Sequence, residues 1–311
     1  MKYSFVLPAY KSTYLREAID SILMQTYNEF ELIIVNDASP EDLKSIVASY
    51  NDKRIRYYVN DVNVGGKDLV AQWNYCASYA KGEYLILASD DDVYFPQYLE
   101  KMNVLVDKFP DVDVFRPRIN KINHNGDIIA EDVEYKERMT QIEFSALKFQ
   151  WKISGGISMY LFRRKALDKI GGFVNFPIAW FSDDATVIKL SKNDIIISND
   201  ILFSFRNSGI NITSCKSDIQ TLCKKISATE SFYKWLITEV DQMICYNESD
   251  TANVRMIRNT SSFRRNDHII YCIKNSSCSH NLMQCWKVLS KLKILKYTDR
   301  IKIFCRSCFS K

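Results

Sequence analysis

The stretch Tyr84-Leu85-Ile86-Leu87-Ala88-Ser89-Asp90-Asp91-Asp92 decides the fold and the chemistry that we predict for this chain. Its first five residues are apolar and typical of a buried β-strand. Three aspartates directly after such a strand need a counter-charge, because buried unpaired carboxylates are costly. Ligands of open α/β sheets bind at the carboxyl ends of strands, so the pattern predicts a divalent cation held by oxygen ligands. A solvated acidic loop before a helix explains the same residues without a ligand.

Three apolar runs, at residues 4–7, 30–35 and 55–59, are predicted as strands that precede this stretch. Residues 4–7 form an apolar run that ends at Pro8, and residues 30–35 form a second one that ends at Asp37. Helical spacing of apolar residues separates them. Continuous apolar strands that alternate with helices predict an α/β fold with a mostly parallel central sheet and helices on both faces. We therefore expect the strand ends at Pro8, Asp37 and residues 89–92 to meet at one edge of the sheet.

Further elements are predicted from local signals. Ser39 is expected to cap a helix whose first turn holds residues 40–42. Asn125-Gly126 between apolar runs predicts a β-hairpin, so antiparallel strands should enter the second half. Residues 155–164 are expected to form one strand, and residues 182–192 a helix that begins at a Ser/Asp cap. From about Cys215 the chain becomes helical, basic and rich in cysteine.

Composition limits the classes of function. The chain has 311 residues, 47% hydrophobic residues and a net charge of +5, which predicts a globular protein and gives no reason to expect nucleic acid as a partner. No apolar window approaches the length of a membrane span, so a cytoplasmic location is expected. His124, His268 and His280 lie outside the acidic loops, which argues against a histidine base or zinc ligand. No serine elbow, P-loop or GxGxxG follows the first strand, so hydrolase and dehydrogenase readings are disfavoured.

Several ordered motifs resemble family 2 glycosyltransferases of the GT-A fold. The resemblance covers about residues 2–210 and rests on five stretches: Val6-Leu7-Pro8-Ala9-Tyr10, residues 25–39, Ala80-Lys81-Gly82-Glu83-Tyr84, Phe162-Arg163-Arg164 with residues 170–173, and Asp183-Asp184. It implies a catalytic domain at 1–214, with a nucleotide-binding half at 1–117 and an acceptor half at 118–214. A helical basic C-terminal region would follow at 215–311.

The same resemblance implies a nucleotide-sugar site. Pro8, Ala9 and Tyr10 would line the nucleotide pocket, and Asp37 would accept a hydrogen bond from uracil, since a carboxylate only accepts. Asp90 would face the ribose or the metal. Asp91 would hold Mn²⁺ or Mg²⁺ on the diphosphate, where the cation stabilises the charge of the leaving group.

The resemblance also implies a base and shows departures from the family pattern. Asp184, with Asp183 as the alternative, would take the proton of the attacking acceptor hydroxyl. Ser89 stands where the family often has an aspartate, which leaves Asp91 with the metal. Contact with the diphosphate would fall to Lys67 or Arg206. Lys67 is otherwise a solvated lysine, and Arg206 a structural ion-pair partner.

These assignments imply an inverting, metal-dependent transferase. It would move a sugar from a nucleotide sugar, most simply UDP-linked, to a hydroxyl of a glycan or lipid-linked acceptor in surface polysaccharide or glycolipid assembly. A metal-dependent nucleotidyltransferase is one alternative, although that class needs a glycine-rich loop after the first strand and Pro8-Ala9-Tyr10-Lys11 has no glycine. A non-catalytic nucleotide-sugar binding module is another, suggested by Ser89 alone. An oligomer is compatible with all three.

Residues 285–311 have a distinct composition, in which apolar side chains alternate with eight basic residues against the single acid Asp299. One interpretation is a solvated helical segment that packs on the catalytic domain. The other is an interfacial segment that binds the anionic cytoplasmic membrane, where a lipid-linked acceptor would be found.

Overall fold

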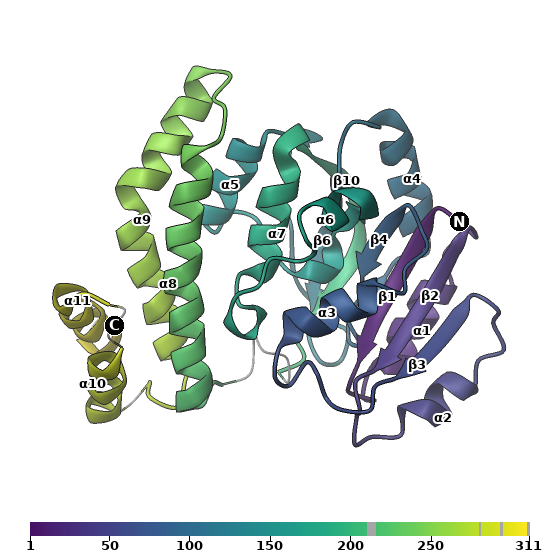
Figure 1. The fold of residues 1–311 in the computed structure, drawn as a ribbon, viewed down its shortest axis with the longest axis horizontal. Coiled ribbons are helices and arrows are strands. Elements are labelled where there is room, and N and C mark those ends of the chain that lie inside the picture. Colours follow the sequence, from purple (N-terminus) through teal and green to yellow (C-terminus); the bar gives the residue numbers. More distant parts are fainter. Residues whose placement is uncertain (210–215, 280, 293–294, 310–311) are drawn as a thin grey trace.

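The computed structural model describes residues 1–209, 216–279, 281–292 and 295–309. Its strands form one sheet in the order β3-β2-β1-β4-β9-β6-β10-β5, with β7 beside β6 and β8 beside β10 (Figure 1). The strands are β1 (Tyr3–Ala9), β2 (Phe30–Asn36), β3 (Ile55–Val59), β4 (Tyr84–Leu87), β5 (Val93–Tyr94), β6 (Val114–Ile122), β7 (Ile128–Glu131), β8 (Arg138–Met139), β9 (Leu161–Arg163) and β10 (Ile195–Arg206).

Helices connect and cover these strands. They are α1 (Leu15–Leu23), α2 (Leu43–Ala48), α3 (Leu69–Ala77), α4 (Tyr98–Lys108), α5 (Gln141–Phe149), α6 (Arg164–Lys169), α7 (Ser182–Leu190), α8 (Ile219–Asp241), α9 (Glu248–Lys274), α10 (Leu282–Lys291) and α11 (Tyr297–Phe309), with short 3₁₀ helices η1 (Ile157–Met159), η2 (Pro177–Ala179) and η3 (Ser191–Asn193). Among the described residues, none of the helices combines the length and the apolar character that crossing a membrane requires.

The N-terminal half is a parallel sheet. Strands β3, β2, β1 and β4 pair in parallel, and every residue of β2 is buried. A strand whose side chains are buried on both faces must be covered on both, as the continuous apolar runs predict. The predicted α/β class is confirmed, and the parallel pairing brings the carboxyl ends of β1, β2 and β4 to one edge.

The second half adds antiparallel strands. Strand β9 lies antiparallel between β4 and β6, and β10 returns parallel to β6. The predicted hairpin at Asn125-Gly126 joins β6 to β7, and Gly126 has a φ of 92°. This left-handed conformation is the reason for a glycine in the turn.

Two predicted elements are wrong in detail. Helix α2 begins only at Leu43, and its N-cap is Asp42, which accepts a hydrogen bond from the Ser45 N–H. The Ser39 hydroxyl cannot cap this helix because it instead donates to the Tyr10 carbonyl (2.6 Å) and accepts from the Glu41 N–H.

Residues 155–164 do not form one strand. Only β9, Leu161–Arg163, is extended, and η1 precedes it. Ser158 in η1 is fixed by two contacts with the acidic loop and β5, since its hydroxyl donates to Asp92 and its carbonyl accepts from Tyr94 Oη. These contacts with distant residues hold the segment as a tight turn. They override the strand pattern of its sequence.

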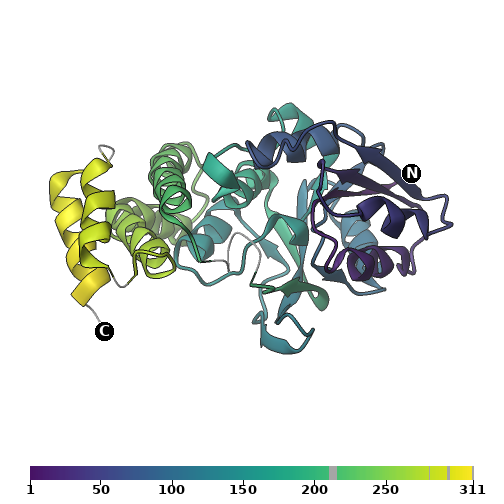
Figure 2. The same ribbon diagram turned by 90° about the horizontal axis from the view of Figure 1, so that it is seen from below.

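Helices α8 and α9 form an antiparallel pair beside the sheet, and α10 and α11 lie at the end of the molecule farthest from the N-terminal strands (Figures 1 and 2). Phe232 and Leu236 of α8 belong to the main hydrophobic core. Leu222 and Ile226 of the same helix belong to a second cluster, which α10 and α11 complete. The helical character predicted after Cys215 is present, while the predicted boundary itself lies in 210–215, outside the described residues.

Candidate active site

A cavity of about 380 Å³ opens at the carboxyl ends of β1, β2 and β4. Its size is typical of a small-molecule site. The structure brings together here most of the residues predicted for donor and metal binding, and adds others from the 63–66 turn and α3. The lining includes Pro8, Ala9, Tyr10, Asp37, Asp90 and Asp91, with Gly65, Gly66, Leu69, Gln72 and Trp73. The predicted meeting of strand ends is therefore observed.

Asp37 lies buried at the end of β2 as an oriented acceptor. One carboxylate oxygen accepts from Asn60 Nδ2 (2.7 Å) and the Val64 N–H (2.9 Å), and the other accepts from the Gly65 N–H (2.7 Å). A side chain at Gly65 would place its Cβ 2.9 Å from that second oxygen, so glycine permits the close approach. A carboxylate has about four acceptor positions, and one of them is left for a ligand.

Asp90 ties the acidic loop to the loop after β1. Its Oδ2 atom accepts the backbone N–H groups of Tyr10 (3.0 Å) and Lys11 (2.9 Å). Burial raises the pKa of the Asp90 carboxyl, the two backbone N–H groups and the Lys11 charge oppose this, and the Asp91 charge adds to the increase. Asp90 therefore lines the cavity and also fixes the backbone of Tyr10 in the cavity wall.

Asp91 presents its carboxylate to the cavity between two hydroxyl groups. Ser89 Oγ donates to Oδ1, and Ser208 Oγ donates to Oδ2 at 3.2 Å. Ser89, the departure from the family pattern, thus orients the neighbouring carboxylate. Hydroxyl donors of this kind hold a carboxylate in place and leave it acceptor positions.

Asp92, the third aspartate, does not line the cavity. It is buried and accepts hydrogen bonds from Ser158 Oγ (2.6 Å) and the Arg206 N–H (2.9 Å). Burial, with the nearby Asp91 charge, raises the pKa of Asp92 to about 8. It joins the acidic loop to η1 and to β10, a structural role that the sequence pattern does not separate from ligand binding.

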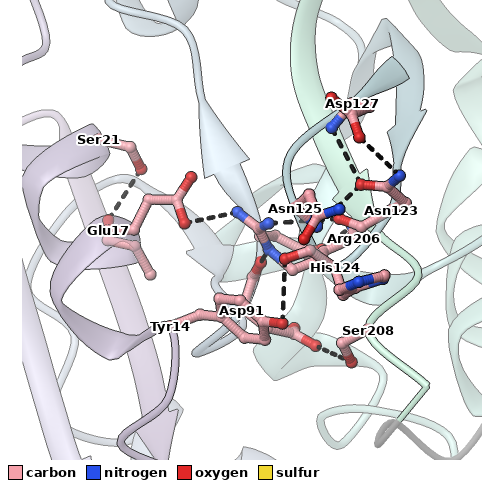
Figure 3. A network of polar contacts seen from close by, with 12 residues as sticks. Tyr14, Glu17, Ser21, Asp91, Asn123, His124, Asn125, Asp127, Arg206 and Ser208 are labelled. Carbon is pink, nitrogen blue, oxygen red and sulfur yellow. Dashed lines mark hydrogen bonds and ion pairs between the residues drawn. The ribbon is translucent and has the colours of Figure 1, made fainter. Parts of the chain in front are cut away.

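Lys67 and Arg206, the two residues predicted to reach the diphosphate, are not among the lining residues of this cavity. Lys67 is exposed in the turn before α3. Arg206 is 1% exposed, and its guanidinium forms an ion pair with Glu17 (2.6 Å) and donates to the Asp91 carbonyl (2.8 Å), as Figure 3 shows. The geometry favours the structural ion pair that was the alternative role of Arg206.

A second chamber of about 320 Å³ adjoins the first and contains Asp183 and Asp184. The two share Leu69, Trp73 and Ile157 as lining residues. Both aspartates lie in the first turn of α7, whose N-cap residue Phe181 has a φ of 71° and makes no side-chain cap. The expected Ser/Asp cap is absent because Ser182 Oγ instead accepts from the Phe176 N–H (3.0 Å).

Sequence reasoning missed Lys148, which forms a buried ion pair with Asp184 at 2.5 Å. Burial lowers the pKa of Lys148, but the charges of Asp184 and Asp183, with the hydrogen bond to Asp184, together raise it above its ordinary value. The pKa of Asp183 rises to about 7, through burial first and the Asp184 charge second. In the sequence, Lys148 stands between Leu147 and Phe149 in an apolar segment. This pattern indicates a buried charge, but it does not identify the partner of that charge.

The carboxylates of this cavity would hold a divalent cation only when a bound diphosphate supplies further oxygen ligands. Within the described part of the chain, no group of three or more His, Cys, Asp or Glu side chains is placed to hold a metal. Asp91 and Asp90 supply carboxylate oxygens at the cavity. Mg²⁺ is commonly bound by one or two carboxylates plus substrate phosphates, so the donor set fits a cation that a diphosphate helps to coordinate.

Comparison with known proteins identifies the class. The family model for glycosyl transferase family 2 matches residues 4–171, which is more than half of the chain. The protein therefore belongs to this family, as its sequence motifs predicted.

Curated relatives cover part of the chain. An uncharacterized glycosyltransferase of Rickettsia typhi is 32% identical over 149 residues, 46% of this chain and 45% of that protein. The putative glycosyltransferase EpsE of Bacillus subtilis is 40% identical over 98 residues, 30% of this chain and 34% of EpsE. The chain thus matches less than half the length of each of these relatives.

Solved structures share the fold across nearly the whole chain. S. aureus TarS 1-349 in complex with UDP-GlcNAc gives a TM-score of 0.66 at 16% identity, covering 99% of this chain and 90% of that one. The mannosyltransferase PcManGT from Pyrobaculum calidifontis, in complex with GDP-Man and Mn²⁺, gives 0.57 at 12% identity, covering 100% and 88%. At these identities the likeness establishes the fold.

Proposed function

We propose that this protein is an inverting, metal-dependent glycosyltransferase that uses a UDP-linked sugar. The observation that carries the proposal is the pair of adjoining chambers. One holds Asp37 and Asp91 at the strand ends, and the other holds Asp183 and Asp184 beside it. We assign residues 1–117 to donor binding, 118–214 to the acceptor side and 215–311 to a helical region that supports it.

The donor would lie in the first chamber. The remaining acceptor position of Asp37 suits the N–H of uracil, and Pro8, Ala9 and Tyr10 would flank the nucleotide. Asp91, with Asp90 behind it, would hold Mn²⁺ or Mg²⁺, which as a Lewis acid stabilises negative charge on the departing diphosphate. TarS with UDP-GlcNAc and PcManGT with GDP-Man and Mn²⁺ support this arrangement by sharing the fold.

The reaction would take place between the chambers. The acceptor oxygen forms a bond to the anomeric carbon as the bond from that carbon to the diphosphate oxygen breaks, and the hydroxyl proton passes to a carboxylate. Lys148 forms an ion pair with Asp184, and burial, with the nearby Asp184 charge, raises the pKa of Asp183 to about 7. A proton acceptor with a pKa near the working pH is the most effective one. We assign proton acceptance to this pair.

The acceptor would enter from a third chamber of about 370 Å³. It shares Lys148, Phe181 and Asp184 with the second chamber. Its outer wall carries Trp151, Tyr233 and His268, with the His268 ring 4.5 Å from that of Trp151. Aromatic side chains suit the apolar faces of sugar rings, and polar lining residues such as Glu131, Lys152 and Ser154 suit their hydroxyl groups. A glycan or lipid-linked saccharide is therefore the acceptor class that we propose.

Thermal unfolding of the full chain with UDP-, GDP-, CDP- and ADP-sugars, each with MnCl₂ and with EDTA, tests the donor. A ligand that binds the native state raises the melting temperature by mass action. We expect a UDP-sugar to give the largest increase, and a larger one with Mn²⁺ than with EDTA. Hydrolysis of the bound donor would then separate an enzyme from a binding module. An unchanged melting temperature with every nucleotide sugar would contradict the proposal.

The tail supports a further part of the proposal, peripheral attachment to the cytoplasmic face of the membrane. Val288, Leu289, Leu295 and Ile303 are buried in the second cluster, so these side chains pack mainly on α8 and α9 rather than on the catalytic domain at 1–214. Exposed Lys287, Lys296 and Lys302 lie with exposed Met283, Tyr297 and Ile301 on α10, α11 and their connection. Ile294, Lys293 and Lys311, which the membrane interpretation included, lie outside the described residues. A basic surface of this kind suits anionic lipid.

Replacing Lys287, Lys296 and Lys302 together with glutamine should weaken vesicle binding. Each basic residue near an anionic surface contributes about 1 kcal/mol, so the loss should be roughly 100-fold. Co-sedimentation with phosphatidylserine vesicles at low and high salt measures it. A variant with glutamine at the exposed lysines Lys44, Lys53 and Lys165 is the matched control. Equal sedimentation of the two variants would leave the tail as packing alone.

A further inference from the structure

Arg206 lies at the centre of a network that joins three distant segments to the acidic loop (Figure 3). Its guanidinium pairs with Glu17 of α1 (2.6 Å), donates to the Asn123 carbonyl of the β6–β7 turn (3.4 Å), and lies over the Tyr14 ring (4.4 Å). Its Nε donates to the Asp91 carbonyl at 2.8 Å. We refer to Arg206, Glu17, Tyr14 and Asn123 as the arginine clasp.

Burying the guanidinium charge of Arg206 destabilises the fold unless its partners in the clasp are present. A buried guanidinium has to be paired and hydrogen-bonded, and Arg206 is 1% exposed. The carboxylate paired with it is Glu17, whose side chain is 51% exposed on α1. Glu17 therefore keeps the cation in place, although Glu17 is not among the lining residues of the donor cavity.

The end of β10 contacts two successive aspartates of the acidic loop. The Arg206 N–H donates to Asp92 Oδ1 (2.9 Å), and Arg206 Nε donates to the Asp91 carbonyl. Two residues later Ser208 Oγ donates to the Asp91 carboxylate (3.2 Å). The peptide and the carboxylate of Asp91 are thus both held from β10, so the direction of this carboxylate depends on the position of Arg206.

We infer that the arginine clasp positions Asp91 for a divalent cation, and that Arg206 and Glu17 are positioning residues of the donor site rather than contacts of the diphosphate. This inference rests on the proposed function, because it takes Asp91 as the cation ligand. Partners that orient a metal ligand commonly contribute 10- to 100-fold to metal affinity. Glu17, a half-exposed residue outside the cavity, would therefore contribute to the affinity for the cation.

Glu17→Gln tests the inference, because Glu17 is half-exposed and its replacement should disturb the fold little. Calorimetric titration of the full chain with UDP in MnCl₂ should show about tenfold weaker binding, while UDP binding in EDTA stays unchanged. Glu83→Gln is the matched control, because Glu83 is 52% exposed and pairs with Arg163 (2.9 Å) at the opposite end of β4. It should leave both titrations unchanged. Arg206→Lys, which keeps the charge but loses the planar fork, should resemble Glu17→Gln.

Thermal unfolding identifies the folded variants, and Glu17→Gln provides the test if Arg206→Lys does not fold. Equal Mn²⁺-dependent UDP affinity in wild type and folded Glu17→Gln would overturn the inference and leave the proposed function standing. The same loss in Mn²⁺ and in EDTA would also overturn it, because the clasp would then support the nucleotide and not the cation. A wild-type protein that binds UDP equally with and without Mn²⁺ would overturn both the metal dependence and the clasp.

Discussion

Asp91→Asn should lower the affinity for UDP in the presence of Mn²⁺ by about 100-fold or more. Loss of a metal ligand should cost at least as much affinity as loss of a residue that orients the ligand, which commonly costs 10- to 100-fold. An amide keeps the size of the side chain, and it can accept from one of the two serine hydroxyls and donate to the other. It removes the charge that a cation requires. The fold should survive, because the Asp91 charge adds to the burial that raises the pKa of Asp90 and Asp92, and removing this charge relieves the repulsion.

Calorimetry with UDP in MnCl₂ and in EDTA measures this effect, together with the melting temperature of each protein. Asp107→Asn, at an exposed carboxylate paired with Lys2, is the control and should bind as wild type does. A folded Asp91→Asn protein with wild-type affinity for UDP and Mn²⁺ would show that the cation site lies elsewhere.

Asp184→Asn should keep donor binding and lower turnover by about 10²- to 10⁴-fold, the usual contribution of a general base. The measured rate is donor hydrolysis, in which water takes the place of the acceptor hydroxyl. Asp183→Asn is the matched variant, because the two side chains share the second chamber. If Asp183→Asn alone is inactive, Asp183 is the proton acceptor and Asp184 serves with Lys148 to tune it. Full activity in both variants would remove the pair from the mechanism.

The pH dependence follows from the same pair. With the pKa of Asp183 raised to about 7, the rate should increase as the pH rises through that value. In Asp184→Asn the midpoint of any remaining activity should move to lower pH, because a nearby negative charge is gone. Stability has the opposite trend: a carboxyl whose pKa is higher in the folded than in the unfolded chain stabilises at low pH. That contribution is lost as the pH rises from about 4 to about 7.

The sequence was sufficient for the buried parallel strands. Continuous apolar runs identify β1, β2 and β4, and parallel pairing then places Pro8, Asp37 and Asp91 at one edge. Contacts between distant segments could not be predicted. Lys148 and Asp184 are 36 residues apart and meet only through the packing of α5 on α7. Asp92 is indistinguishable from Asp91 in the sequence, and only the buried partners Ser158 and Arg206 give it a different role.

Helices α8 and α9 contribute side chains to both hydrophobic clusters. We expect the part of each helix that packs in the second cluster to unfold separately from the part that packs in the main core. Phe232 and Val254 pack in the main core, whereas Leu222 and Ile269 pack with α10 and α11. Amide protons near Leu222 and Ile269 should therefore exchange by partial opening, while those near Phe232 need global unfolding. Tyr233 Oη and His268 Nδ1 are 2.6 Å apart at the third chamber, and His268 directly precedes Ile269 of the second cluster. Helix α9 therefore connects α10 and α11 to the proposed acceptor chamber.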